Sequence, residues 1–183
     1  MSTLHIGFIG LGLIGGSIAK ALKKNVTNLH ITAFDVNNTT LTEAVNDGIV
    51  DVATDTIDHR FHNCEYIFLC APVQKNDANL ESVKAVMSKN CILTDVGSVK
   101  TGIHETAEKL NLTKQFIGGH PMAGKEVSGV ENSDESIFLG ANYLVVPTEK
   151  NPPEAIELCR NLGEILGFRQ VSELSVKEHD EMI

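Results

Sequence analysis

Two residues that could handle a proton, His120 and Ser98, each follow an apolar segment typical of a buried strand. His120 comes after the segment at 115–118, and Ser98 comes after the segment at 91–94. An imidazole with its ordinary pKa near 6.5 can take a proton from a hydroxyl group while hydride leaves the same carbon. A serine could hydrogen-bond either that hydroxyl or the imidazole ring. The two residues therefore suggest the oxidation of an alcohol.

Each of these residues also has a structural interpretation. His120 could be a turn histidine bonded to backbone, although a place at the carboxyl end of a predicted strand should direct its ring toward a cofactor cleft. Ser98 could cap the helix whose apolar residues include Ile103 and Leu110, and we expect it at that cap.

A glycine-rich turn near the amino terminus could hold the oxidant. The apolar run at 4–9 predicts a buried strand, and a helical pattern resumes after Gly10-Leu11-Gly12-Leu13-Ile14-Gly15. In such a turn the first glycine bends the chain, the second admits a pyrophosphate, and the third lets the helix approach the sheet. Free N–H groups at the start of a helix attract phosphate. We expect residues 10–15 to bind a dinucleotide.

Asp35 favours NAD over NADP as that dinucleotide. It ends the predicted strand at 29–34 and follows Gly15 by 20 residues, the spacing of a carboxylate that binds the adenosine ribose. A 2′-phosphate some 4–5 Å away would be repelled by about 3–4 kcal/mol per unit charge pair at an effective dielectric of ~20. No Arg or Lys follows in residues 36–38 to offset that repulsion.

The elements that must position these residues alternate between strands and helices along the chain. Strands are predicted near 4–9, 29–34, 48–53, 66–70, 91–94, 115–118, 142–146 and 168–171, with helices between most of them. This alternation predicts an α/β fold, a Rossmann-type, doubly wound, mainly parallel sheet with helices on both faces. Ligands of such sheets lie at the carboxyl ends of the strands. We therefore add to the cofactor site Cys70, Ala71, Pro72, Val73, Val96 and Gly97.

Composition narrows the class of protein. The 183 residues are 42% hydrophobic and 21% charged, with a formal net charge of −9, which argues against nucleic acid or an anionic membrane as partner. No apolar run reaches the ~18 residues of a membrane span, and because Met1 leads directly into the first predicted strand we expect no signal peptide. The four cysteines form no C-x-x-C pair, so we expect reduced thiols, no metal site and a cytoplasmic protein.

Three segments together resemble the prephenate dehydrogenase family. They are GLGLIGGS at 10–17, DVGSVK at 95–100 and GHPMAGKE at 119–126, and the likeness extends to the His179-Asp180 pair. The resemblance implies NAD-dependent oxidative decarboxylation of prephenate to 4-hydroxyphenylpyruvate, a step of tyrosine and hence aromatic amino acid biosynthesis. It also implies that His120 accepts the proton of the ring C4 hydroxyl, that Ser98 positions both groups, and that Glu126 lies at the mouth of the active site. Lys125 could attract the dianionic substrate.

The chain is shorter than the members of that family. They continue into a helical domain that forms the homodimer and supplies an arginine and a histidine for the substrate carboxylates. We expect residues 1–174 to form the NAD-binding domain and residues 175–183 to begin a helix leading into that absent domain. A truncated chain of this kind should bind NAD and turn over prephenate weakly or not at all.

Other functions remain open at this point. The substrate could be arogenate, which carries an amino group where prephenate has a keto group. The chain could be another Rossmann oxidoreductase, such as a β-hydroxyacid dehydrogenase or a pyrroline-carboxylate reductase, although these lack the segment at 119–124. It could also be a dinucleotide-binding module without catalytic activity.

Overall fold

The first part of the chain forms a five-stranded parallel sheet. The structure, a computed structural model, describes residues 2–124 and 127–183. The strands follow the order β3-β2-β1-β4-β5, and all neighbours run parallel. Their bounds are β1 Leu4–Ile9, β2 Leu29–Phe34, β3 Val52–Thr54, β4 Tyr66–Leu69 and β5 Ile92–Asp95. Successive strands are added on one side of β1 as far as β3 and then on its other side from β4, as in dinucleotide-binding folds. This arrangement confirms the predicted fold class.

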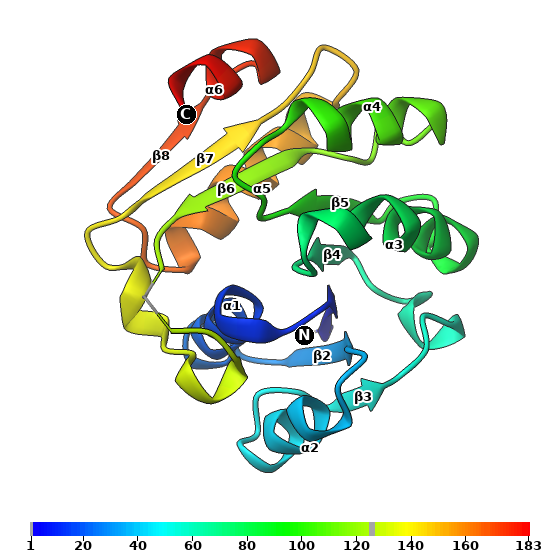
Figure 1. The fold of residues 1–183 in the computed structure, drawn as a ribbon, viewed down its shortest axis with the longest axis vertical. Coiled ribbons are helices and arrows are strands. Elements are labelled where there is room, and N and C mark those ends of the chain that lie inside the picture. The colour runs from blue at the N-terminus through cyan, green and yellow to red at the C-terminus, as the bar shows by residue number, and fades with distance from the viewer. Residues whose placement is uncertain (1, 125–126) are drawn as a thin grey trace.

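Helices cover both faces of this sheet, as Figure 1 shows. The apolar run of β4 divides between two buried clusters, because successive side chains of a strand point to opposite faces. Phe68 joins the cluster that includes residues of α1 and α5, whereas Ile67 and Leu69 join the cluster that includes residues of α3 and α4. The helices are α1 Gly12–Asn25, α2 Asn38–Asn46, α3 Val73–Val86, α4 Thr101–Lys109, α5 Pro153–Ile165 and α6 Val176–Met182, with short 3₁₀ turns η1 His59–Phe61, η2 Val130–Asn132 and η3 Glu135–Phe138.

A second, three-stranded sheet lies beside the first (Figure 1). It consists of β6 Gly118–Met122, β7 Asn142–Val146 and β8 Gln170–Glu173, with β6 antiparallel to β7 and β7 parallel to β8. The chain enters β6 from a parallel bridge between Phe116 and Leu93 of β5. The strand predicted at 115–118 is therefore where the chain passes from the first sheet to the second.

This second sheet corrects the expectation for His120. The sequence placed it after the end of a strand, whereas it lies in the middle of β6, opposite Leu144 of β7. Pro121, which suggests a turn, is accommodated because β6 is an edge strand and needs no N–H on its open side. Local sequence could not reveal this pairing, because β7 begins about twenty residues further along the chain.

Replacing Gly10 with Ala should lower the free energy of unfolding by ~1–3 kcal/mol. Gly10 has a φ of +91°, and a Cβ there would lie 2.7 Å from the backbone nitrogen of Ala71. Gly102→Ala in α4 is the matched control, because nothing lies within 4 Å of the place its Cβ would take, and it should raise stability by ~0.5–1 kcal/mol. Urea denaturation measures both, and an undiminished stability of the Gly10 variant would contradict the close approach.

Candidate active site at the carboxyl edge of the first sheet

The glycine-rich turn leaves the start of α1 open. Gly10 lies so close to the exit of β4 that an added Cβ would meet the backbone of Ala71. Gly12, with a φ of +50°, has nothing within 4 Å of the place where a Cβ would stand. The first turn of α1 receives no side-chain cap. Its N–H groups and the positive end of the helix dipole are therefore available to an anionic group.

A pocket of about 410 Å³ lies beside this turn. It brings together six of the residues predicted for the cofactor, namely Gly10, Leu11, Asp35, Cys70, Ala71 and Pro72. Four further lining residues were not predicted: Phe34, Val36, Lys75 and Asn79. The volume falls in the range of small-molecule sites. Val73, Val96 and Gly97 do not line it, and neither do residues 12–15 of the adjoining turn.

Asp35 is fixed at the rim of this pocket by backbone donors. Its Oδ2 accepts a hydrogen bond from the N–H of Leu11 at 3.0 Å, and its Oδ1 accepts one from the N–H of Asn37 at 2.9 Å. A carboxylate has about four acceptor positions, so two remain for the hydroxyl groups of a ribose. Cys70, which also lines the pocket, is unsuited to act as a nucleophile, because burial and the charge of Asp95 raise the pKa of its thiol.

A buried ion pair holds the loop after β5, and its carboxylate also binds the start of β6. The Nζ of Lys100 donates to Oδ2 of Asp95 at 2.7 Å and to the carbonyl of Gly97 at 2.6 Å, and both side chains are almost fully buried. The other oxygen of Asp95 accepts the N–H of Gly119, next to His120, at 3.1 Å. Asp95 therefore holds the loop after β5 and the strand of His120 in a fixed relation.

His120 is joined to two residues near the end of the chain. Its Nδ1 lies 2.8 Å from Nε2 of His179, whose Nδ1 lies 2.7 Å from Oδ1 of Asp180. The Asp180 carboxylate also accepts the N–H groups of Lys100 at 2.9 Å and Thr101 at 2.8 Å, which places it at the start of α4. The His179 ring is fully buried, whereas His120 is half-buried.

The surroundings of His120 keep its ring neutral. Burial lowers the pKa of His120, repulsion from the Lys100 ammonium and from a protonated His179 ring would lower it further, and Asp95 opposes them, with a resulting pKa of about 4. Burial alone would raise the pKa of Asp180, but hydrogen bonds from Thr101, His179 and backbone N–H groups hold it well below its usual range. At pH 7 the site thus contains an ionised Asp180 and a neutral His120 that can accept a proton.

Ser98 does not cap α4, contrary to the expectation from sequence. The helix begins at Thr101, its N-cap residue is Lys100, and its first N–H groups are bound by Asp180 from α6. Ser98 is exposed in the loop after β5, and in the described part of the chain it forms no hydrogen bond with His120. Its loop is nevertheless anchored to Asp95 through the N–H of Gly97 at 3.1 Å. Lys125 and Glu126, also predicted at the site, lie outside the described residues.

Sequence reasoning missed Asp95, Lys100, His179 and Asp180 as parts of the site. Asp95 and Lys100 stand in the segment that also contains Ser98, where a carboxylate and an amine five residues apart were the available signal. His179 and Asp180 marked only the extent of a resemblance. Their position beside His120 depends on how α6 folds back over α4.

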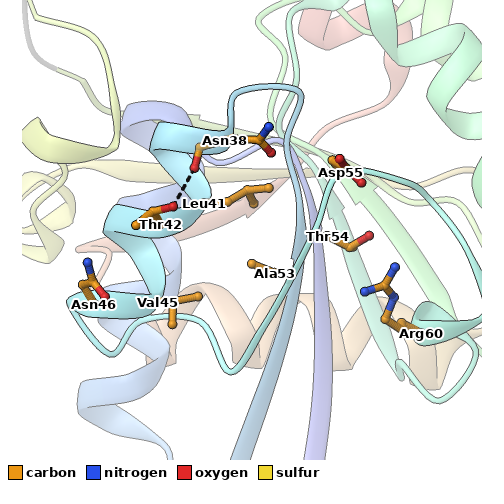
Figure 2. Close-up of a pocket in the computed structure, with 9 residues that line it drawn as sticks. All are labelled: Asn38, Leu41, Thr42, Val45, Asn46, Ala53, Thr54, Asp55 and Arg60. Atoms are coloured by element: carbon orange, nitrogen blue, oxygen red, sulfur yellow. Dashed lines mark hydrogen bonds between the residues drawn. The ribbon is translucent and has the colours of Figure 1, made fainter.

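A second pocket, of about 500 Å³, lies at the β3 edge of the first sheet and contains none of the predicted site residues. Figure 2 shows its lining from α2, β3 and the segment around η1: Asn38, Leu41, Thr42, Val45, Asn46, Ala53, Thr54, Asp55 and Arg60. The guanidinium of Arg60 is already bound to Asp58 through Nε at 3.0 Å and Nη2 at 2.7 Å. The positive charge of Arg60 is therefore already paired with a carboxylate and is less available to an anionic ligand.

Two absences bear on other functions. Within residues 2–124 and 127–183, no three His, Cys, Asp or Glu side chains are grouped so that they could hold a metal ion. In the same ranges, no helix has the length and apolar character that crossing a membrane requires.

Comparisons with known proteins identify relatives across the chain. A family model described as "Prephenate dehydrogenase, nucleotide-binding domain" matches residues 18–172, beginning just after the glycine-rich turn. A prephenate dehydrogenase of Bacillus subtilis is 34% identical over 93% of this chain and 46% of its own length. The chain thus spans about half the length of that curated relative.

Two solved structures share the fold closely. A prephenate dehydrogenase from A. aeolicus, in complex with hydroxyphenyl propionate and NAD+, superposes with a TM-score of 0.92 at 31% identity, over 100% of this chain and 63% of that one. An arogenate dehydrogenase from Synechocystis superposes with a TM-score of 0.90 at 35% identity, over 98% of this chain and 62% of that one.

The titration of His120 should begin only in acid. Because its folded pKa of about 4 lies below the unfolded value near 6.5, the contribution of the neutral ring to stability is present above pH 6.5 and is lost as the pH falls toward 4. His120→Asn, which cannot titrate, should lose less stability than the wild type between pH 7 and pH 4.5. Urea midpoints at both pH values measure the difference, and equal losses would show that the pKa is not lowered.

Proposed function

Because this chain belongs to the prephenate dehydrogenase family, whose nucleotide-binding domain it matches, we propose that it binds NAD and serves the oxidative decarboxylation of prephenate. The 4-hydroxyphenylpyruvate formed would lie on the route to tyrosine. The observation that carries the proposal is the neutral His120, whose strand is attached by the buried Asp95 to the carboxyl edge of the first sheet, where the dinucleotide-type pocket also lies. Cys70 of that pocket follows Leu69, which pairs with Asp95 across β4 and β5, and Asp95 accepts the N–H of Gly119 beside His120.

The pocket residues fit a dinucleotide. The open backbone at Gly12 and the uncapped start of α1 suit a pyrophosphate, and Asp35 retains acceptor positions for the adenosine ribose. Val36 and Pro72 offer apolar surface for the adenine. When bound, NAD would supply the acceptor for the hydride that leaves the substrate. The remaining predicted contacts, Leu13, Ile14, Gly15, Val73, Val96 and Gly97, stay predictions.

The work of the chain's own residues is orientation and proton acceptance. His120 would accept the proton of the substrate's ring hydroxyl, because its lowered pKa keeps a lone pair available at pH 7. Ser98 would hydrogen-bond the same hydroxyl from the loop after β5. Loss of the ring carboxylate makes the product ring aromatic, so the reaction itself is strongly downhill and positioning is the main requirement. Roles for Lys125 and Glu126 at the mouth of the site rest on the resemblance alone.

Substrate choice, assembly and location complete the proposal. A solved relative is named an arogenate dehydrogenase, so arogenate is the second candidate substrate. Homodimerisation, and the division of the chain at residue 174, stay predictions. A cytoplasmic location is supported by the four unpaired cysteine thiols, three of them buried, which suit a reducing compartment.

Asp35→Asn should remove the preference for NAD over NADP. In the wild type, repulsion of about 3–4 kcal/mol should make NADP bind about a hundredfold or more weaker than NAD. Isothermal titration calorimetry of the 183-residue chain with each nucleotide should show that difference shrinking to less than tenfold in the variant. Asp47→Asn makes the same charge change at an exposed site beyond α2 and should leave both affinities as they were. Equal affinities of the wild type for NAD and NADP would contradict the role of Asp35.

His120→Asn should abolish most turnover while leaving NAD binding intact. Loss of a positioned proton acceptor typically slows a reaction by about 10²–10⁴-fold. Formation of NADH from prephenate is followed in whichever form of the protein is active, this chain or a longer one. His59→Asn, at an exposed histidine of η1, is the control. Wild-type turnover in the His120→Asn variant would rule out the proposed chemistry, and an absence of turnover in every form would favour a binding module.

A further inference from the structure

The two hydrogen bonds that connect His120 through His179 to Asp180 determine where protons lie as well as how the rings are placed. Each partner determines whether the next nitrogen donates or accepts. An ionised carboxylate can only accept hydrogen bonds. Oδ1 of Asp180 lies 2.7 Å from Nδ1 of His179, so this nitrogen must carry a proton and donate it. In its neutral form the fully buried His179 ring has one N–H, which is the one on Nδ1. Its other nitrogen, Nε2, is therefore an acceptor.

The same logic applies one step further along. Nε2 of His179 lies 2.8 Å from Nδ1 of His120, so an accepting Nε2 requires the proton of His120 to be on Nδ1. The lone pair of His120 then stands on Nε2. Within the described residues, that nitrogen has no hydrogen-bond partner, and the ring is half-buried rather than enclosed. The free lone pair is thus on the nitrogen that no described protein group occupies.

We propose that His179 and Asp180 are positioning residues that fix the tautomer of His120, with the proton on Nδ1 and the accepting lone pair on Nε2. Neither needs to touch the substrate. The arrangement parallels the role of the aspartate in Ser-His-Asp triads, which holds a histidine in the tautomer that accepts a proton. Its consequence for proton acceptance rests on the proposed function, whereas the tautomer itself is a property of this chain.

Asp180 and His179 are held firmly in place, which keeps His120 in one tautomer. Its carboxylate is held by two backbone N–H groups of Lys100 and Thr101 and by the Thr101 hydroxyl at 2.5 Å. The His179 ring has no exposed surface, and it meets His120 edge to face with ring centroids 5.0 Å apart. Both rings therefore have little freedom to turn and exchange their nitrogens.

Long-range ¹H–¹⁵N correlation spectra of the histidine rings test the proposal on the 183-residue chain at pH 7, without substrate or cofactor. In the wild type, His120 should show one protonated Nδ1 and one unprotonated Nε2, with widely separated nitrogen shifts. In Asp180→Ala, water replaces the carboxylate, and water can both donate and accept. The two nitrogen shifts of His120 should then move toward each other, as both tautomers become populated.

Thr101→Val is the matched control, because it weakens the attachment of α6 to α4 by one hydrogen bond and keeps the carboxylate. It should leave the His120 shifts of the wild type unchanged, whereas a general loosening of α6 would move them in both variants. A wild-type His120 protonated on Nε2, or unchanged His120 shifts in Asp180→Ala, would overturn the proposal. None of these outcomes depends on NAD binding or turnover, so the proposed function can fail separately.

In a form of the protein that turns over prephenate, Asp180→Ala should lower kcat by about tenfold or more and leave KM for NAD near the wild-type value. Thr101→Val should change kcat less than threefold. Equal losses of kcat in the two variants would indicate that Asp180 acts only by holding α6 in place.

Discussion

The candidate site depends on one buried ion pair, that of Asp95 and Lys100. Two charges removed from water are tolerated only where they are paired and hydrogen-bonded to further groups, as they are here. Asp95 accepts from Lys100 and from the N–H groups of Gly97 and Gly119, while Lys100 also donates to the carbonyl of Gly97. Removing one partner of such a pair typically costs about 3–5 kcal/mol, because the other charge remains buried alone. The loop after β5 and the strand of His120 are therefore held together by a rigid contact.

The same pair shapes the electrostatics of His120. The ammonium of Lys100 disfavours a second positive charge on the nearby imidazole, and burial acts in the same direction. The ionised Asp180 lies one ring further away, on the far side of His179. A positive charge on one side and a histidine acceptor on the other together leave His120 neutral but oriented. An unprotonated, oriented lone pair at neutral pH is one requirement of a proton acceptor.

The dinucleotide half of the site was largely predictable from the sequence, because its signals are local. A glycine-rich turn after an apolar run, and a carboxylate at the end of the next strand, follow from residues close together in the chain. The structure places Gly10, Asp35 and Cys70 around one pocket. The additional lining residue Lys75 was not predicted, because its contribution depends on which face of α3 turns toward the switch point between β1 and β4.

The sequence by itself determined the parallel α/β order of the first sheet, the glycine-rich turn and the identity of His120 as the residue with suitable chemistry. Only the tertiary structure decided that His120 lies inside an edge strand and that Asp180 rather than Ser98 caps α4. It also decided that His179 lies between His120 and Asp180. These contacts join residues 59 and 80 positions apart, between His120 and His179 and between Lys100 and Asp180. The spacing of apolar residues, every 2 residues in a strand and every 3.6 in a helix, predicts which face of an element is buried. It contains no information on which distant element will supply a hydrogen-bond partner.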